Sequence, residues 1–187
     1  LFGWSTSATL YGINSSTSNI YSGDFLDWGA AASKDLGYGW RTLTKDEWTY
    51  IFSSRTVTNS LSDGARYTMA TIGGTYKGII LFPDSYTHPS GTGYTAGTYN
   101  AASNYTTTVT SEFWTQMEAA GAVFLPAAGR RYGSGVSGVG SDGGYWSSTA
   151  LNASVAYTLN FHSSYVYPAD HGGRYFGFSV RLVQNLN

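Results

Sequence analysis

The sequence contains no cysteine, little charge and no long apolar run. Charged residues make up 11% of its 187 residues, and 10 Lys and Arg against 11 Asp and Glu leave a net charge of −1. Without Cys the chain has no disulfide framework, no Cys-ligated zinc or iron–sulfur site and no thiol catalysis. Near-neutral charge argues against a nucleic-acid or polyanion binder, which needs clustered Lys and Arg to neutralise phosphates. No segment approaches the ~20 apolar residues of a membrane-spanning helix.

Aromatic residues and glycine are abundant instead, with 6 Trp, 16 Tyr, 9 Phe and 24 Gly. Disordered chains are poor in aromatic residues, so this composition indicates a folded, turn-rich protein. The length suits one domain over 1–187, of which 1–38 reads as irregular. No signal peptide is recognisable, and because Leu1 is not Met we expect the chain to come from a longer or processed product.

Two helices are predicted in the first two thirds of the chain. Thr44 and Glu47 form a capping box, and the apolar residues that follow are spaced for a helix over 45–53. A second helix is predicted over 111–120, ended by Gly121.

Strands are predicted mainly in the last third. Short buried strands are expected at 77–82 and 122–125, and 85–108 is expected to be a long ordered loop or a strand-poor insertion. The segment 145–149 is a strand candidate, and alternating apolar residues predict strands over 155–162 and 178–183, with a loop over 163–177. Early helices followed by a late strand meander indicate an α+β fold with much irregular loop.

Little in the sequence points to catalysis or to a cofactor. The three histidines, His88, His162 and His171, have no metal-ligand spacing, and no nucleophile motif is present. The glycines around Ser134 resemble a phosphate loop, but no Lys-Ser/Thr and no helix follow, so turn glycines are favoured. We therefore expect no enzyme activity, no metal and no cofactor.

The segment from Gly129 to Val183 has an unusual composition. It contains no Lys, Glu, Gln or Met, and its only Trp is Trp146. It is rich in Tyr, Ser, Gly, Asn, Asp and His, the residue types that antibody paratopes also favour. Lys and Glu are among the commonest residues of proteins, so their absence from so long a segment needs a cause.

Several motifs resemble known families. Gly39–Trp48 and Gly177–Val183 resemble the sulfatase-modifying-factor branch of C-type lectin-like folds. Trp40–Trp48, Gly121–Arg130 and Tyr145–Thr149 resemble, more closely, a surface-protein family of Bacteroidales and their phages. Some members of that family are variable proteins of diversity-generating retroelements. The resemblance covers roughly 39–183 and implies a C-type lectin-like fold.

The resemblance also implies a variable binding region at 129–183. Mutagenesis directed at adenines of Asn codons reaches Tyr, Ser, Gly, Asp, His and Phe among others, but not Lys, Glu, Gln, Met or Trp. Thr158 and His162 fall on the expected solvent side of their strand, and Val155 on its buried side. The implied ligand-binding positions are Ser134, Ser137, Asp142, Gly144, Leu151, Ser154, Thr158, His162, Tyr165, Tyr167, Asp170, His171, Gly172, Gly173, Tyr175 and Phe176.

The expected function is therefore ligand or receptor recognition by a hypervariable surface. The partner would be a protein or glycan on a target cell, and the carrier a bacterial surface, a secreted protein or a phage tail. An invariant adhesin or carbohydrate-binding module of a gut bacterium or phage is the alternative. An enzyme of the sulfatase-modifying kind is disfavoured because those enzymes use cysteines. Calcium-dependent sugar binding lacks its Glu-Pro-Asn and Trp-Asn-Asp motifs.

Overall fold

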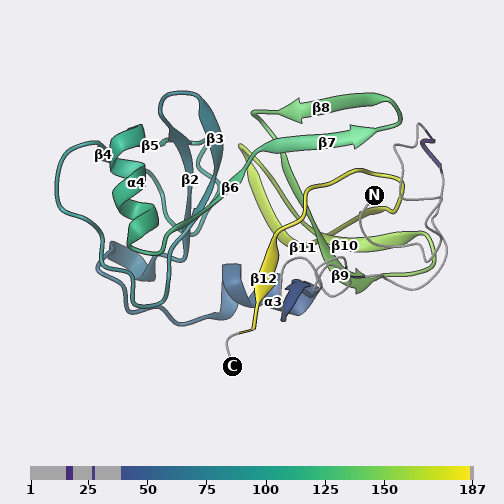
Figure 1. The fold of residues 1–187 in the computed structure, drawn as a ribbon, viewed down its shortest axis with the longest axis horizontal. Helices are drawn as coiled ribbons and strands as arrows, with labels where there is room; N and C mark the ends of the chain where they lie inside the picture. Colours follow the sequence, from purple (N-terminus) through teal and green to yellow (C-terminus); the bar gives the residue numbers. More distant parts are fainter. Residues whose placement is uncertain (1–15, 19–26, 28–38, 186–187) are drawn as a thin grey trace.

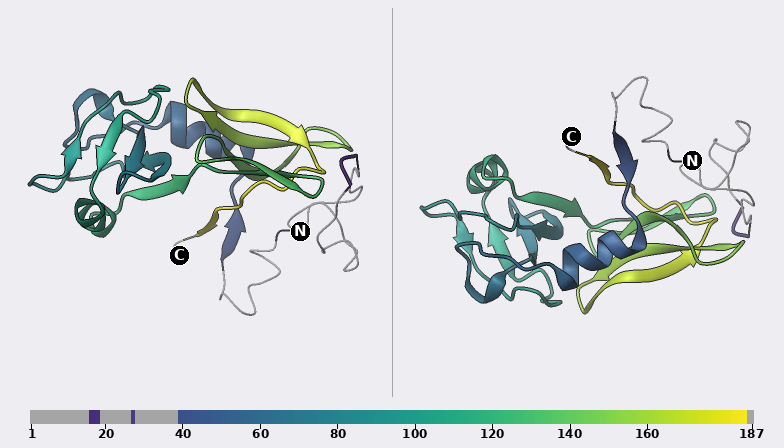
Figure 2. Two further views of the ribbon diagram at one scale, coloured as in Figure 1. Left: turned by 90° about the horizontal axis from the view of Figure 1, so that it is seen from above. Right: turned by 90° about the horizontal axis from the view of Figure 1, so that it is seen from below.

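A computed structural model describes residues 16–18, 27 and 39–185 (Figure 1). The predicted irregular part, 1–38, therefore lies almost wholly outside the described residues. The described chain builds two sheet-based halves, with the helix α3 between them (Figure 2). Across these residues no helix is long and apolar enough to cross a membrane.

The first half is a five-stranded sheet in the order β4-β5-β2-β3-β6, accompanied by the helix α4. The side chains of Ile80, Phe82, Phe113 and Met117 form its core between sheet and helix. The bounds are β2 Tyr67–Ile72, β3 Tyr76–Leu81, β4 Tyr94–Thr95, β5 Thr107–Val109, α4 Ser111–Ala119 and β6 Val123–Pro126.

The second half is a five-stranded sheet in the order β11-β10-β9-β7-β8. A separate two-stranded sheet pairs β1, Trp40–Thr42, with β12, Leu182–Gln184, and so joins distant parts of the chain. The bounds are β7 Ala128–Tyr132, β8 Gly135–Val139, β9 Gly143–Ala150, β10 Val155–His162 and β11 Tyr165–Gly173.

Local sequence signals account for both longer helical segments. The predicted capping box is present: the Thr44 hydroxyl accepts from the Glu47 amide, and the Glu47 carboxylate accepts from the Thr44 amide. It starts α3, Lys45–Thr49, which continues as a π-helix, η2, over Tyr50–Ser54. A short 3-10 turn, η3, covers Ser62–Gly64. α4 begins at an N-cap threonine and is followed by Gly121 with φ 94°, a left-handed value that glycine adopts without strain.

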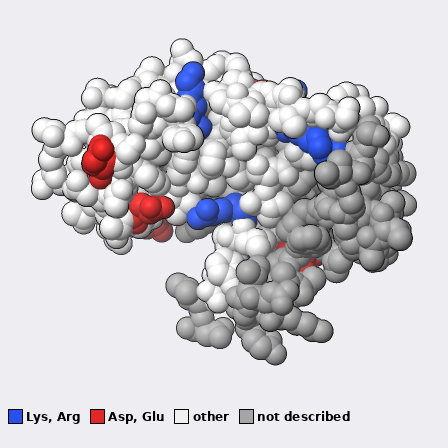
Figure 3. Space-filling model, turned by 45° about the horizontal axis from the view of Figure 1, so that its top comes forward, with Lys and Arg blue, Asp and Glu red and all other residues white. Residues whose placement is uncertain are grey.

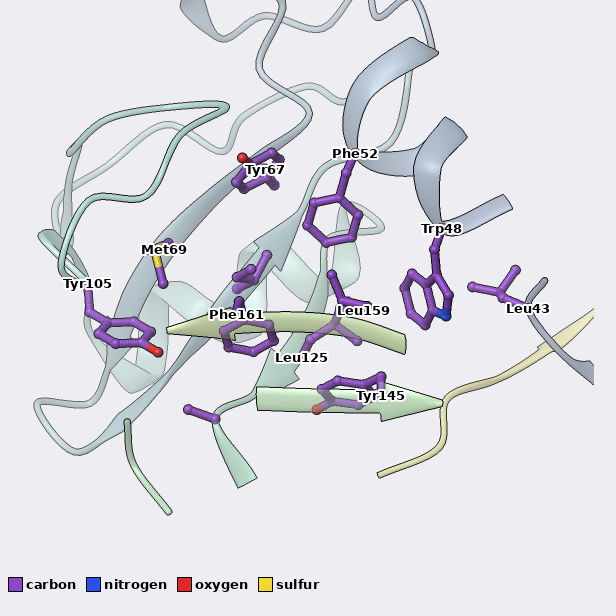
Figure 4. Packing of buried hydrophobic residues seen from close by; sticks show 12 residues of the cluster. Leu43, Trp48, Phe52, Tyr67, Met69, Tyr105, Leu125, Tyr145, Leu159 and Phe161 are labelled. Carbon is purple, nitrogen blue, oxygen red and sulfur yellow. The ribbon is translucent and has the colours of Figure 1, made fainter. Parts of the chain in front are cut away.

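The main core lies where α3 meets strands of both sheets (Figure 4). Trp48 from α3 and Phe52 from η2 face Tyr145 of β9 and Tyr67 of β2, with ring centroids 6.3 Å apart for Trp48–Tyr145 and 4.9 Å for Phe52–Tyr67. The Trp48 indole also donates a hydrogen bond to the Trp146 carbonyl at 3.4 Å. The two halves therefore share one apolar cluster, beside the separate core of the first half.

The predicted α+β class, and with it the C-type lectin-like fold, is wrong: the described residues are β-rich, with 43% in strands, 14% in helices and two short α-helices among them. The main cause is strands that lack an apolar alternation, among them β7 and β8. The segment predicted as a loop over 163–177 is largely the strand β11, which is held by its ladder with β10 and contains few apolar residues. The expected strand over 178–183 forms only as β12 at its end.

Candidate binding face

Alternation along β9, β10 and β11 gives this sheet two different faces. One face carries Tyr145, Leu159 and Phe161 into the main core. The other face carries the residues that alternate with these. On it, Trp146 of β9 lies beside Thr158 of β10, and Asn160 of β10 lies beside Tyr167 of β11. We call this second side the outer face; its members are Gly144, Trp146, Thr158, Asn160, His162, Tyr165, Tyr167 and Asp170.

The segment between β11 and β12, residues 174–181, which we call the C-terminal segment, covers part of the outer face. It passes between β7 and β9 (Figure 1), with bridges from Arg131 to Gly177 and from Tyr145 to Ser179. The Phe178 ring lies 4.8 Å from that of Trp146 in an edge-on arrangement. A small apolar cluster, in which residues of the C-terminal segment pack against Trp146 of β9 and Ala156 of β10, therefore covers a part of the sheet that would otherwise be exposed.

This cover corrects two expected contact positions. Thr158, predicted to face solvent, is only 1% exposed. Gly144 is buried as well, and a Cβ placed there would lie 2.2 Å from a ring carbon of Phe178. The alternation itself is as predicted, but the C-terminal segment packs over the face that was expected to be open.

The uncovered part of the outer face carries a row of polar and aromatic side chains. The rings of Tyr165 and Tyr167 stack with centroids 4.9 Å apart and 10° between their planes. The His162 ring lies 5.5 Å from Tyr165, and the Asn160 amide donates to Asp170 at 2.9 Å. The stacking on Tyr165 holds the Tyr167 ring in place, and because Tyr167 is 55% exposed, much of this ring remains accessible to a ligand.

Asp142 connects this row to β7. Its carboxylate lies 3.6 Å from the Arg130 guanidinium and 3.8 Å from His162 Nε2. Its own backbone is fixed, since the Asp142 carbonyl accepts from Gly129 and its amide donates to Gly138. Burial, with a smaller contribution from the Asp142 charge, raises the pKa of the Tyr165 phenol, which therefore remains a neutral hydrogen-bonding group.

Beyond Arg130 a shallow cavity of about 230 Å³ opens between the β7–β8 hairpin and the C-terminal segment. Its walls are Arg130, Tyr132, Ser137, Tyr175 and Phe176. We call it the aromatic cavity. The structure thus gathers Ser137, Tyr175 and Phe176, which the sequence singled out, around two residues that it did not.

A second cavity of about 410 Å³ lies at the edge of the sheet, where β11 is the last strand. It is lined by Thr49, Tyr167, Pro168, Ala169, Asp170 and His171. His171 pairs with Tyr157, so it belongs to the side that faces α3. It is therefore separated from His162, and the two histidines do not form a site together.

The remaining predicted positions are dispersed. Ser134 is exposed in the β7–β8 turn, and Leu151 and Ser154 lie at the β9–β10 turn. Gly172 and Gly173 are half-buried, and a Cβ at Gly173 would lie 2.4 Å from the Tyr175 ring. Val155, expected on the buried side, is half-buried.

The residues that sequence reasoning missed are Arg130, Tyr132 and Asn160. Arg130 and Tyr132 are two apart on β7, so strand alternation puts both on one side, and Tyr132 is 47% exposed. Asn160 could have been found from the sequence, because it lies two residues before His162 on β10 and therefore faces the same side of the sheet. In the described part of the chain no group of three His, Asp or Glu side chains could hold a metal ion.

Comparison with known proteins yields one family similarity. Residues 92–183 match a family described as a domain of unknown function (DUF8237). The matched part runs from just before β4 to β12 and includes the outer face and the aromatic cavity. No curated protein and no solved structure shows a significant similarity to the chain.

Proposed function

We propose that the protein is a recognition module that binds a protein or glycan of a target cell through the outer face, without a chemical step. The observation that carries the proposal is the stacked pair Tyr165–Tyr167 on a rigid strand, with Tyr167 largely exposed. Large exposed rings that are held in place bury area at little entropic cost, which is why Tyr is common in binding surfaces.

Polar groups around this pair would give direction to the contact. His162, Asp170 and Asn160 can each donate or accept a hydrogen bond beside the rings. Charged residues make up only 11% of the chain, and the face drawn in Figure 3 shows few of them, so we expect contacts through shape and neutral polar groups more than through long-range attraction.

We further propose that a diversity-generating retroelement rewrites part of this face. In support, residues 129–183 lack Lys, Glu, Gln and Met, the residues besides Trp that adenine-directed changes of Asn codons cannot produce. His162, Tyr165, Tyr167 and Asp170 are all of the types that such changes produce. The carrier would be a bacterial surface, a secreted protein or a phage tail. The gene neighbourhood tests this: a near-copy of the 3′ end that differs only at adenines, beside a reverse transcriptase gene, is expected.

An invariant adhesin or carbohydrate-binding module is the second candidate. The aromatic cavity favours it, because aromatic walls with a few polar groups suit a sugar ring. Absence of any template copy, together with reproducible binding to one glycan class, would favour this alternative.

Binding of fluorescently labelled protein to a panel of bacterial cells tests the recognition role. We expect binding to some cells, an at least about tenfold weaker affinity for Tyr167→Ala, and an unchanged melting temperature. Tyr76→Ala is the matched control, since Tyr76 is 68% exposed on β3, outside the outer face. Equal losses in both variants, or no loss in either, would contradict the assignment of this face.

A further inference from the structure

The aromatic cavity combines three rings with a cationic group that has spare hydrogen-bonding capacity. The rings of Tyr132, Tyr175 and Phe176 contact one another, with centroids 5.8 Å apart for Tyr132–Tyr175, 5.3 Å for Tyr132–Phe176 and 4.7 Å for Tyr175–Phe176. This mutual support fixes the walls in the absence of a ligand, which lowers the entropic cost of binding.

Arg130 lies at one side of these rings. Its guanidinium carbon is 5.9 Å from the Phe176 centroid, and its side chain is 39% exposed. The nearest carboxylate, that of Asp142, is 3.6 Å away, beyond hydrogen-bond distance. A guanidinium has five N–H donors. No hydrogen bond from those donors to another described residue is present, so they can serve a ligand.

Its neighbour Arg131 is used differently. Arg131 Nη1 donates to the Gly133 carbonyl at 2.7 Å, and its backbone bridges to Gly177. Arg131 thus holds the hairpin and the C-terminal segment together, whereas Arg130, one residue earlier, turns toward the cavity. Two adjacent arginines on one strand therefore have separate tasks, as alternation requires.

We propose that the aromatic cavity binds a single carboxylate-bearing sugar ring, such as a uronic acid, at the end of an acidic glycan. The planar Arg130 fork would bind the carboxylate through two parallel hydrogen bonds. The apolar side of the sugar ring would lie on the Tyr132 or Phe176 ring, and the Ser137 hydroxyl would bond a sugar hydroxyl. This inference rests on the proposed recognition function and names its ligand class at one subsite.

Size and charge both favour one acidic ring. The cavity of about 230 Å³ is smaller than sites for drug-sized ligands, which are roughly 300–1,000 Å³, so it has room for one ring. The Asp142 carboxylate next to Arg130 disfavours a ligand with several negative groups, because like charges repel. The rest of the glycan could then continue along the outer face toward His162 and Tyr165.

Calorimetry of the full chain with methyl glucuronide and with the matched neutral methyl glucoside tests the proposal. We expect measurable binding of the glucuronide only, weaker at 500 mM than at 50 mM salt because a partly exposed charge pair is screened. Arg130→Lys keeps the charge but loses the fork, so a drop of about tenfold or more is expected. Arg181→Gln, which removes an exposed charge elsewhere, should bind as the wild type does.

Three results would overturn it: equal binding of both sugars, unchanged binding in Arg130→Lys, or equal binding of acetate, which lacks the ring. The Tyr167→Ala cell assay separates this failure from failure of the proposed function. If Tyr167→Ala loses cell binding while no glucuronide binds, the recognition role stands and the acidic-sugar subsite is wrong. If Tyr167→Ala also binds cells normally, both fail.

Discussion

Phe178 lies directly against Gly144: a Cβ added to this glycine would come within 2.2 Å of the ring. The contact fastens the C-terminal segment onto β9, where the Trp146 ring receives the same phenylalanine edge-on. Part of the predicted variable region thus has a packing role. The same C-terminal segment places Tyr175 and Phe176 in the wall of the aromatic cavity and packs on the adjacent sheet.

Gly144→Ser should therefore destabilise the protein. The added side chain must displace the Phe178 ring, and overpacking of this kind costs roughly 1–3 kcal/mol in free energy of unfolding. Urea denaturation measures it. Gly135→Ser is the matched control, because a Cβ there meets its nearest atom at 3.6 Å and the residue is exposed. A Gly144→Ser protein as stable as the Gly135→Ser protein would show that Phe178 is not packed as described.

Thr158→Val should leave stability unchanged or raise it by up to about 1 kcal/mol. The Thr158 hydroxyl is buried and has no hydrogen-bond partner among the described residues, so valine removes a polar group that gains nothing from burial. Thr68→Val is the contrasting variant: its hydroxyl bonds the Thr98 carbonyl at 3.0 Å and the Thr107 hydroxyl at 2.6 Å.

Losing these bonds in Thr68→Val should cost about 1–3 kcal/mol, since the buried Thr107 hydroxyl keeps only the Gly97 amide as a partner and the Thr98 carbonyl loses this donor. Chemical denaturation of both variants under one condition makes the comparison. Equal destabilisation of the two would mean that the Thr158 hydroxyl does bond a partner.

Because of Glu47, the free energy of unfolding should fall as the pH is lowered from about 4.5 toward 2. Its hydrogen bond to Arg41, with those from Thr44, lowers the pKa of this carboxyl from 4.5 to about 2. Below the ordinary pKa the unfolded chain binds a proton that the folded chain does not, so this stabilisation is present above about pH 4.5 and is lost as the pH falls toward 2.

Glu47→Gln should accordingly flatten the fall in unfolding free energy between pH 5 and pH 2, measured by denaturant titration at each pH. Glu118→Gln is the control, because Glu118 is exposed on α4 and makes no ion pair with a described residue; it should follow the wild-type curve. A Glu47→Gln curve parallel to the wild type would argue against the Arg41–Glu47 pair.

Short-range signals explain what could be read from the sequence. The capping box at Thr44 and Glu47 sets the start of α3, because the groups that satisfy the first amides are three residues apart. The same holds for the end of α4 at Gly121 and for the alternation of β10, Val155–His162. Each of these depends only on neighbours along the chain.

The strands β7, β8 and β11 could not be predicted in this way. β11, Tyr165–Gly173, begins with strand-favouring Tyr and Val but continues through Pro, Asp, His and Gly without an apolar alternation, so its second half does not favour a strand. Its partner β10 determines it through a backbone ladder that any sequence of compatible shape can join.

The candidate site also has a part that could be predicted from the sequence and a part that could not. By itself the sequence determined which residue types fill 129–183 and which side of β10 carries Thr158 and His162. The tertiary structure alone decided that Phe178 packs against Gly144 and Trp146, that Thr158 is buried while His162 stays half-buried, and that Arg130 lines one cavity with Tyr175 and Phe176. Burial depends on what packs over a face, and the packing segment here lies some twenty residues further along the chain, beyond the reach of periodicity.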